Sequence, residues 1–214
     1  MAQSHEARAL ALAAAAAVVA SAGDLLLLWV GNSQRPELGL PTAPGVALPL
    51  GGILGVVAIP AYALGYRALA RAAGAVAPRL ARAIALSGLG IGAIGALIHG
   101  LTALVIRAGL ASASTGAPPL EAVSEQPELV WSWLAAALCL LAASTAIAAA
   151  SVPRVRALPA AIGLANPLAL TIALALAGMP AEWGRSFLLP AAPNLAHVVF
   201  FALAHAVLGR PRAA

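Results

Sequence analysis

Three ionisable side chains stand within stretches that are otherwise apolar: Asp24, His99 and His197. Asp24 is the only aspartate in the 214 residues, and it directly precedes four leucines in the segment SAGDLLLLWVG. A carboxyl group and an imidazole that share one polar pocket are suited to proton transfer near neutral pH. The residue types therefore predict general acid–base chemistry, with Asp24, His99 and His197 as the catalytic candidates.

The overall composition is that of a membrane protein. The chain is 62% hydrophobic and only 9% charged, whereas about a quarter of the residues in soluble domains are charged. The net charge of +5 comes from twelve arginines and no lysine, and these arginines stand at the ends of apolar segments. We therefore expect membrane lipids as partners and no nucleic acid. The bias towards Ala, Arg and Gly suggests a bacterial source.

Six apolar stretches approach the roughly 20 residues that a helix needs to cross a bilayer. Segments with Pro, Gly and charged residues separate them, and none of these segments is long enough for a second domain. The sequence thus predicts an all-α polytopic membrane protein, one bundle over residues 1–214. Its six helices are expected at about 9–30, 46–68, 83–106, 129–150, 157–178 and 188–208.

The arginines predict how this bundle is oriented. Three of them (Arg35, Arg107 and Arg185) fall on one side of the predicted spans, and nine fall on the other. Because loops on the cytoplasmic side are rich in Arg and Lys, both termini are expected in the cytoplasm, in a bacterial inner (plasma) membrane. The nine are Arg8, Arg67, Arg71, Arg79, Arg82, Arg154, Arg156, Arg210 and Arg212.

The depth of the polar residues suggests that they meet. With a rise of about 1.5 Å per residue, Asp24 lies about 9 Å, His99 about 12 Å and His197 about 13 Å from the outer helix ends. Asn194 lies on the same helix as His197, and with Phe201 these residues form one polar and aromatic helix face. We therefore expect a polar pocket in the outer half of the bilayer.

Further residues are candidates for substrate binding in this pocket. Asn194 can hydrogen-bond a hydroxyl or an oxyanion, and Phe201 shares its helix face. Trp29 stands at the outer boundary of the first span, where indole side chains are common. Asn166 precedes Pro167, and Tyr62 follows Pro60, so both stand where a proline interrupts a span.

The sequence gives little support for a metal or a cofactor. One aspartate and two histidines form a plausible set for zinc or iron, so any metal would bind Asp24, His99 and His197. However, no two of them stand one helical turn apart, and the sequence has no HExxH motif, phosphate loop, cysteine pair or lysine. We therefore expect neither a metal nor a cofactor.

The favoured function is an enzyme that hydrolyses, isomerises or cyclises a lipophilic small molecule. The first alternative is a proton-coupled small-molecule transporter, since membrane-embedded Asp and His residues also serve as proton relays. The second is a non-catalytic scaffold, in which Asp24 pairs with an arginine such as Arg107 or Arg185. In each case the Gly- and Ala-rich helix faces can also support a homo-oligomer.

Three short motifs resemble an uncharacterised family of small bacterial multi-pass membrane proteins. They are Ala22-Gly23-Asp24-Leu25-Leu26, Ala96-Leu97-Ile98-His99-Gly100, and Pro193-Asn194 followed by Phe200-Phe201. The resemblance implies a polar cluster that is common to the family. It brings no established activity.

Overall fold

The computed structural model describes residues 2–33, 35–111 and 126–209, and the regular structure in these ranges is helical, with no strand. This confirms the predicted all-α class. The α-helices are α1 (Ala2–Asn32), α2 (Ala47–Ala58), α3 (Tyr62–Gly74), α4 (Pro78–Ala111), α6 (Pro127–Ser151), α7 (Ala160–Leu164), α8 (Pro167–Gly178) and α9 (Leu189–Leu208). Short turns of other helical types are η1 (Pro36–Leu38), η2 (Ile59–Ala61) and η4 (Gly184–Leu188).

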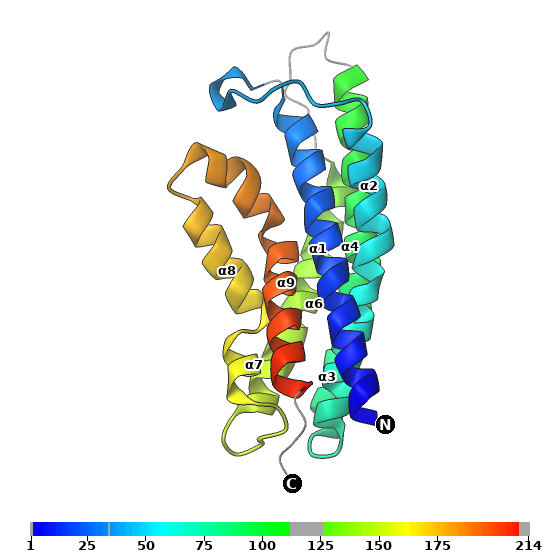
Figure 1. Ribbon diagram of the computed structural model, residues 1–214, viewed down its shortest axis with the longest axis vertical. Coiled ribbons are helices and arrows are strands. Elements are labelled where there is room, and N and C mark those ends of the chain that lie inside the picture. Colours follow the sequence, from blue (N-terminus) through cyan, green and yellow to red (C-terminus); the bar gives the residue numbers. More distant parts are fainter. Residues whose placement is uncertain (1, 34, 112–125, 210–214) are drawn as a thin grey trace.

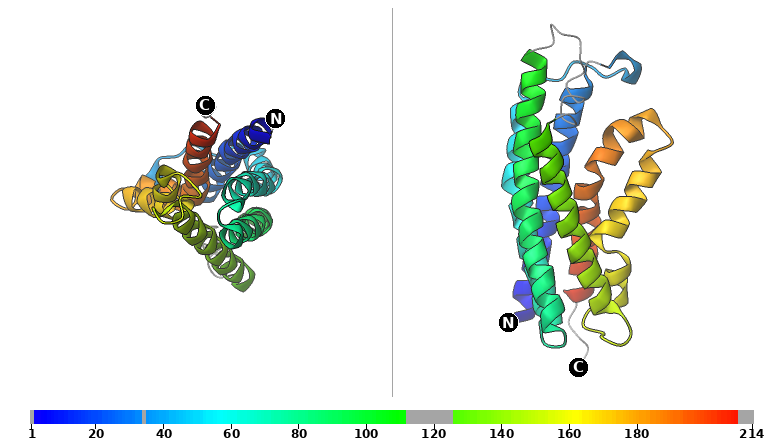
Figure 2. Two further views of the ribbon diagram at one scale, coloured as in Figure 1. Left: turned by 90° about the horizontal axis from the view of Figure 1, so that it is seen from below. Right: turned by 180° about the vertical axis from the view of Figure 1, so that it is seen from behind.

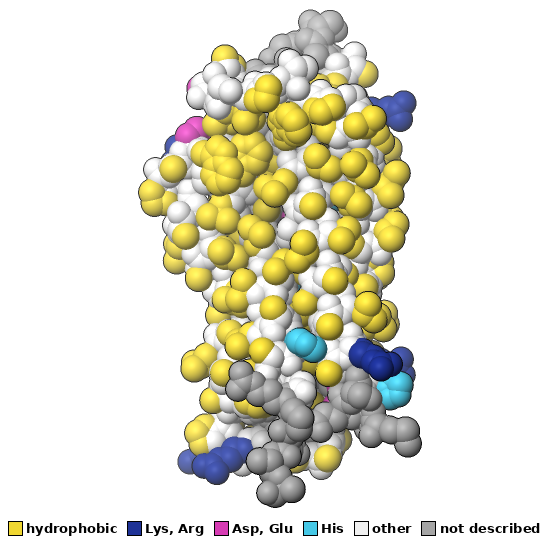
Figure 3. All heavy atoms as spheres, in the orientation of Figure 1, with side chains coloured by type: hydrophobic (Ala, Val, Ile, Leu, Met, Phe, Trp, Pro, Cys, Tyr) yellow, Lys and Arg dark blue, Asp and Glu magenta, His cyan; other side chains and the backbone are white. Residues whose placement is uncertain are grey.

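Within the described ranges, five helical segments are long and apolar enough to cross a membrane. They are His5–Asn32, Ala47–Gly74, Pro78–Ala111, Pro127–Ser151 and Gly184–Leu208, and they correspond to five of the six predicted spans. The second of them continues from α2 through η2 into α3, so Pro60 introduces a single 3-10 turn. Figure 3 shows apolar side chains over the middle of the visible face and charged side chains towards its two ends.

The segment predicted as a span at 157–178 is instead two short helices, α7 and α8. The break falls at Asn166 and Pro167, because proline has no N–H to continue the helix. Asn166 stabilises both sides of the break: its Oδ1 accepts from the N–H of Ala169, and its Nδ2 donates to the carbonyl of Gly163. Since α8 has 12 residues, about 18 Å of helix, it is shorter than the bilayer core. A sixth continuous span is therefore not confirmed.

The helices form a single bundle in which the two ends of the chain meet. α1 packs against α2, α3 and α9, while α4 packs against α2, α3 and α6 (Figures 1 and 2). The Nδ1 of His205 donates to the carbonyl of Ala7 at 3.0 Å. The α3–α4 turn and the loop at 152–159 lie at this same end (Figure 1), and seven of the nine arginines predicted for the inner side belong to this region. The other two, Arg210 and Arg212, lie outside the described residues.

An aromatic core fills the half of the bundle that contains the chain ends. Tyr66, Phe200 and Phe201 are fully buried, and their ring centroids lie 5.3 to 6.2 Å apart. Glycines on facing helices make the space: a methyl group on Gly88 would overlap the ring of Tyr66, and one on Gly65 would overlap Phe201. Close packing of this kind holds helices together in lipid.

Candidate active site

Asp24 and His99, from two different helices, lie side by side inside the bundle. The Oδ1 of Asp24 on α1 is 3.4 Å from the Nδ1 of His99 on α4, and their side chains are 15% and 5% exposed. Glycines on neighbouring helices create the space for the imidazole. A methyl group on Gly55 of α2 would overlap the ring, and one on Gly23 of α1 would lie 3.0 Å from its Nε2.

Hydrogen bonding determines how many protons this pair holds. The Nε2 of His99 is 3.1 Å from the carbonyl oxygen of Gly51. Because a carbonyl only accepts, Nε2 carries a hydrogen, and a neutral imidazole then has its lone pair on Nδ1. The contact with Asp24 is attractive when a single proton lies on either Nδ1 or Oδ1. The pair is then an ion pair or a neutral acid beside a neutral imidazole, and its net charge is zero in both forms.

Asn194 binds the second carboxyl oxygen of Asp24, and Tyr62 binds Asn194. The Nδ2 of Asn194, on α9, donates to the Oδ2 of Asp24 at 2.7 Å. The hydroxyl of Tyr62, at the start of α3, donates to the Oδ1 of Asn194 at 2.8 Å. Because the hydroxyl needs an acceptor, it determines which end of the amide faces the carboxyl group. The carboxyl group is thus fixed by contacts from α4 and α9.

His197 lies on α9 one turn after Pro193, and both of its ring nitrogens are engaged. Its Nδ1 donates to the carbonyl of Pro193 at 2.7 Å, so its Nε2 accepts from the hydroxyl of Tyr66 at 2.8 Å. The ring of Tyr62 stacks on the imidazole, with centroids 4.6 Å apart. His197 is therefore a buried support beneath the Asp24 site, with no ring nitrogen left for a substrate.

A cavity of about 320 Å³ adjoins these groups. The residues that line it divide into a polar wall, contributed by α1, α3, α4 and α9, and a mostly apolar wall, contributed by α6 and α8. The polar wall contains Asp24, Tyr62, His99, Thr102, Asn194 and His197. The facing wall contains Trp133, Ala136, Ala137, Leu140, Leu168 and Thr171.

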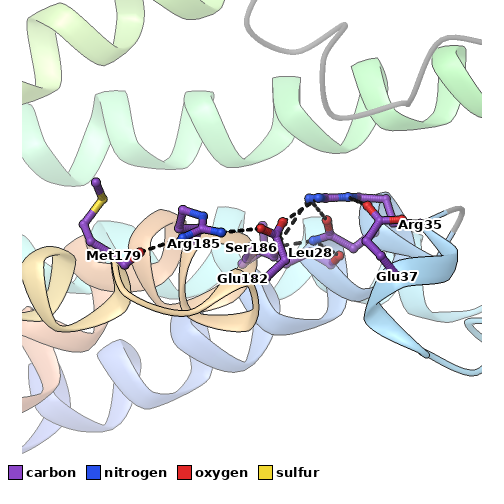
Figure 4. Close-up of polar contacts among 8 residues, drawn as sticks. Leu28, Arg35, Glu37, Met179, Glu182, Arg185 and Ser186 are labelled. Atoms are coloured by element: carbon purple, nitrogen blue, oxygen red, sulfur yellow. Dashed lines mark hydrogen bonds and ion pairs between the residues drawn. The ribbon is translucent and has the colours of Figure 1, made fainter.

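An ion-pair cluster joins the far end of α1 to the turn before α9 (Figure 4). Arg35 pairs with Glu37 at 2.7 Å and with Glu182 at 2.5 Å, and Arg185 pairs with Glu182 at 2.6 Å. Hydrogen bonds from Arg185 and then Arg35 hold the pKa of Glu182 below its ordinary value. Asn32 adds a bond from its Nδ2 to the carbonyl of Ser186 at 3.3 Å. The cluster therefore ties α1 to η4 at the end of the bundle opposite the shared end of α1 and α9.

A family model matches residues 1–209 of the chain, and its description is a family of unknown function, DUF6796. The chain belongs to this family. The match confirms the predicted resemblance to an uncharacterised family. No curated protein and no solved structure matches the chain.

In this DUF6796 member, three residues predicted to bind substrate lie elsewhere. The Nε1 of Trp29 donates to the carbonyl of Pro41 at 2.9 Å, so its indole ties α1 to the following loop. Phe201 packs in the aromatic core, with its ring centroid 5.6 Å from that of His197. Asn166 caps α8. The described lining of the cavity includes none of the three.

Two alternatives for Asp24 do not match the geometry. Its partners are His99 and Asn194, whereas Arg185 pairs with Glu182, and no ion pair between Asp24 and Arg107 occurs among the described residues. The described ranges also contain no group of three His, Cys, Asp or Glu side chains placed to hold a metal ion. The conditional metal set of Asp24, His99 and His197 is therefore not assembled, because His197 binds Tyr66 and Pro193 instead.

Several residues of the site were not predicted from the sequence. Gly51 accepts a hydrogen bond from His99 through its backbone carbonyl, and Gly55 leaves room for the imidazole because it has no side chain. Neither contribution can be recognised from a pattern of polar residues in the sequence. Tyr66 stands one turn after Tyr62, so both tyrosines lie on the same face of α3. This spacing could have indicated that Tyr66, like Tyr62, faces the polar residues of α9. Trp133 lines the cavity and was not among the residues predicted to bind substrate.

Proposed function

We propose that this protein is an intramembrane acid–base enzyme acting on a lipophilic substrate, with Asp24 and His99 as the catalytic pair. The observation that carries the proposal is the 3.4 Å contact between the two side chains in the wall of a cavity. Each can hold the same proton, so one can accept a proton as the other donates one. Paired groups with this property perform general acid–base catalysis.

The pair is best suited to moving a proton within one substrate molecule. In the ion-paired form, the carboxylate of Asp24 accepts a proton from the substrate, and the Nδ1–H of His99 donates one to another substrate atom. This leaves a neutral acid beside a neutral imidazole. Transfer of the proton from Oδ1 to Nδ1 then restores the starting form, so the balance closes without water. Isomerisation and cyclisation fit this cycle.

Hydrolysis fits the arrangement less well, because it requires donors for a developing oxyanion. His197 gives its Nδ1 hydrogen to Pro193, and Asn194 gives one amide hydrogen to Asp24. We assign Asn194 and Tyr62 to positioning, because Asn194 bonds the carboxyl group of Asp24 and Tyr62 bonds Asn194. His197 supports the packing around Tyr62, on whose ring it stacks.

The packing below the site favours an enzyme over a transporter. A transporter needs a polar route from Asp24 towards the opposite end of the bundle, past Tyr66 to His205. The hydroxyl of Tyr66 is bonded to His197, and Tyr66 belongs to a buried apolar cluster that also includes Leu10, Leu69 and Phe200, all fully buried. A cavity closed at this side suits a substrate that enters and leaves by the same route.

We also propose that both termini are cytoplasmic and that the membrane is a bacterial plasma membrane. The concentration of arginines near the shared end of α1 and α9 supports this orientation. It places the cavity in the outer half of the bilayer.

The test compares purified wild-type protein with Asp24→Asn and His99→Gln in vesicles of the expression host's polar lipid extract, prepared in D2O. Mass spectrometry then identifies lipids that gain deuterium or change into isomers. Wild type should convert at least one species, and each variant should lower its rate at least 100-fold, within the range of general acid–base catalysis. Ser151→Ala is the control, since among the described residues the side chain of Ser151 bonds only the carbonyl of Ile147 in its own helix. Full conversion by Asp24→Asn would overturn the proposal.

A further inference from the structure

We infer that the substrate presents a hydrogen-bond donor, a hydroxyl group or a protonated amine, on an apolar body, and that it enters sideways from the hydrocarbon past α6. This inference rests on the proposed function and names the substrate class and the route. It comes from the donors and acceptors that the cavity wall leaves unused and from the exposure of its rim.

Among the polar groups that line the cavity on either wall, four donate a hydrogen to protein acceptors. Tyr62 donates to Asn194, and Thr171 donates to the carbonyl of Pro167 at 2.7 Å. The histidines donate to backbone carbonyls, His99 to Gly51 and His197 to Pro193.

The acceptor capacity of the wall, by contrast, is only partly used. The carboxyl oxygens of Asp24 receive one hydrogen bond from Asn194 and the loose contact with His99. The hydroxyl oxygens of Tyr62 and Thr171 each donate in their hydrogen bond, so their lone pairs can still accept one. A buried acceptor without a donor is unfavourable. A ligand that supplies O–H or N–H groups therefore complements this wall.

The charge of the wall points the same way. Among the described residues, the lining includes no arginine, and its only carboxyl group is that of Asp24. A phosphate or carboxylate head would bring a negative charge into a medium of low dielectric constant, and the described lining has no guanidinium to compensate it. An ammonium head would pair with the carboxylate of Asp24 when His99 is neutral, and a hydroxyl head would leave the charge unchanged.

The rim of the cavity shows where such a ligand enters. Trp133 and Ala137 on α6 and Pro190 at the start of α9 line the cavity and are exposed on the bundle surface, Trp133 by 44%. Towards the outer end, the buried side chains of Leu28 and Phe187 pack together under the ion-pair cluster. Because these exposed residues stand on helical segments that are long and apolar enough to cross a membrane, the rim opens towards lipid.

The experiment uses three long-chain alkyl probes that carry the same diazirine and differ only in the head group: hydroxyl, primary amine or carboxylate. Protein in nanodiscs of phosphatidylcholine is irradiated with each probe, and labelled peptides of α1 and α4 are measured by mass spectrometry. The alcohol and the amine should label the cavity wall at least tenfold more than the carboxylate. Equal or stronger labelling by the carboxylate would overturn the assignment of the head group.

The route is tested with two variants on one helix. Ala137→Trp places an indole in the rim and should lower labelling of the cavity wall at least fivefold. Leu138→Trp is the matched control, because Leu138 is 59% exposed on the same helix and outside the described lining. Trp133→Ala widens the rim and should raise labelling. Unchanged labelling in both rim variants would refute lateral entry.

Failure of this inference can be distinguished from failure of the proposed function. If the alcohol and amine probes label wild type while Asp24→Asn converts lipid fully, the binding site stands and the catalytic role of Asp24 is refuted. If the carboxylate probe labels the cavity wall while Asp24→Asn loses lipid conversion, the proposed enzyme stands and this substrate class is refuted.

Discussion

The imidazole of His99 occupies the space that a side chain on Gly55 would need. A catalytic side chain on α4 is thus positioned by the missing side chain of a residue on α2. Gly51, one turn earlier on α2, adds the carbonyl that accepts from His99. The α2 backbone therefore determines both where the ring lies and which of its nitrogens carries a hydrogen.

We expect Gly55→Ala to displace His99 and to destabilise the bundle by about 1–3 kcal/mol, as overpacking does. Lipid conversion should fall with it. The control is Gly74→Ala, where an added methyl group would meet the Cβ of Ala81 only at 3.9 Å. Unfolding in a denaturing detergent, followed by circular dichroism, measures both. A stable, active Gly55→Ala protein would contradict the described position of His99.

Tyr62→Phe and Tyr66→Phe should differ in their effect on activity. Each removes a donor from a buried acceptor, and each should destabilise the fold by about 1–3 kcal/mol. Tyr62→Phe also releases Asn194, so the carboxyl group of Asp24 loses its orientation and conversion falls. Tyr66→Phe affects only His197 directly. Equal losses of activity at matched stability would show that Asn194 does not position Asp24.

The ion-pair cluster predicts a pH dependence of stability. The pKa of Glu182 is lower in the folded protein than in the unfolded chain. The contribution of ionised Glu182 to the free energy of unfolding is therefore present above the unfolded pKa of about 4.3. It is lost as the pH falls through the folded pKa. Melting of wild type and Glu182→Gln should differ near pH 7 and converge below about pH 4. The difference should also shrink in about 1 M salt, because these side chains are partly exposed.

Glu128→Gln serves as the control for that series. Glu128 stands in the first turn of α6, and no ion pair involving it occurs among the described residues. Its substitution should leave the pH profile of melting unchanged. A wild-type profile that stays parallel to that of Glu182→Gln down to pH 3 would contradict the cluster's contribution.

Asn166 should prove to be a cap rather than a substrate ligand. Asn166→Ala removes the acceptor for the N–H of Ala169 and should destabilise the protein by about 0.5–2 kcal/mol. Asn166→Asp retains that acceptor and should recover most of the loss. Melting temperature and lipid conversion are measured together, and a fall in conversion at unchanged stability would restore the binding role.

Labelling of single cysteines tests the orientation. In a Cys139→Ala background, a cysteine at Val76, in the exposed α3–α4 turn, should react only after the membrane is permeabilised. A cysteine at Glu37, next to the opposite end of α1, should react in intact cells. The reverse pattern would place the cavity in the inner half of the bilayer.

How much of this arrangement can be predicted from sequence depends on the kind of interaction. Asp24, His99 and Asn194 could be placed in one layer because helix geometry converts residue number into depth. The break at Pro167 was visible as an interruption, but the sequence does not say whether a proline bends a helix or ends it. The role of Gly55 could not be predicted, since it depends on which ring faces it across the bundle.

The site joins the two extremes of the chain: Asp24 lies on the first helix, and Asn194 lies on the last. During synthesis, the carboxyl group of Asp24 is inserted long before its amide partner has been translated. An aspartate in the hydrocarbon without a partner is unfavourable by about 2.5–3.5 kcal/mol on the scale of membrane insertion. Chains that stop before α9 therefore lack the amide donor for the Oδ2 of Asp24, and only the contact of its Oδ1 with His99 on α4 offsets that cost.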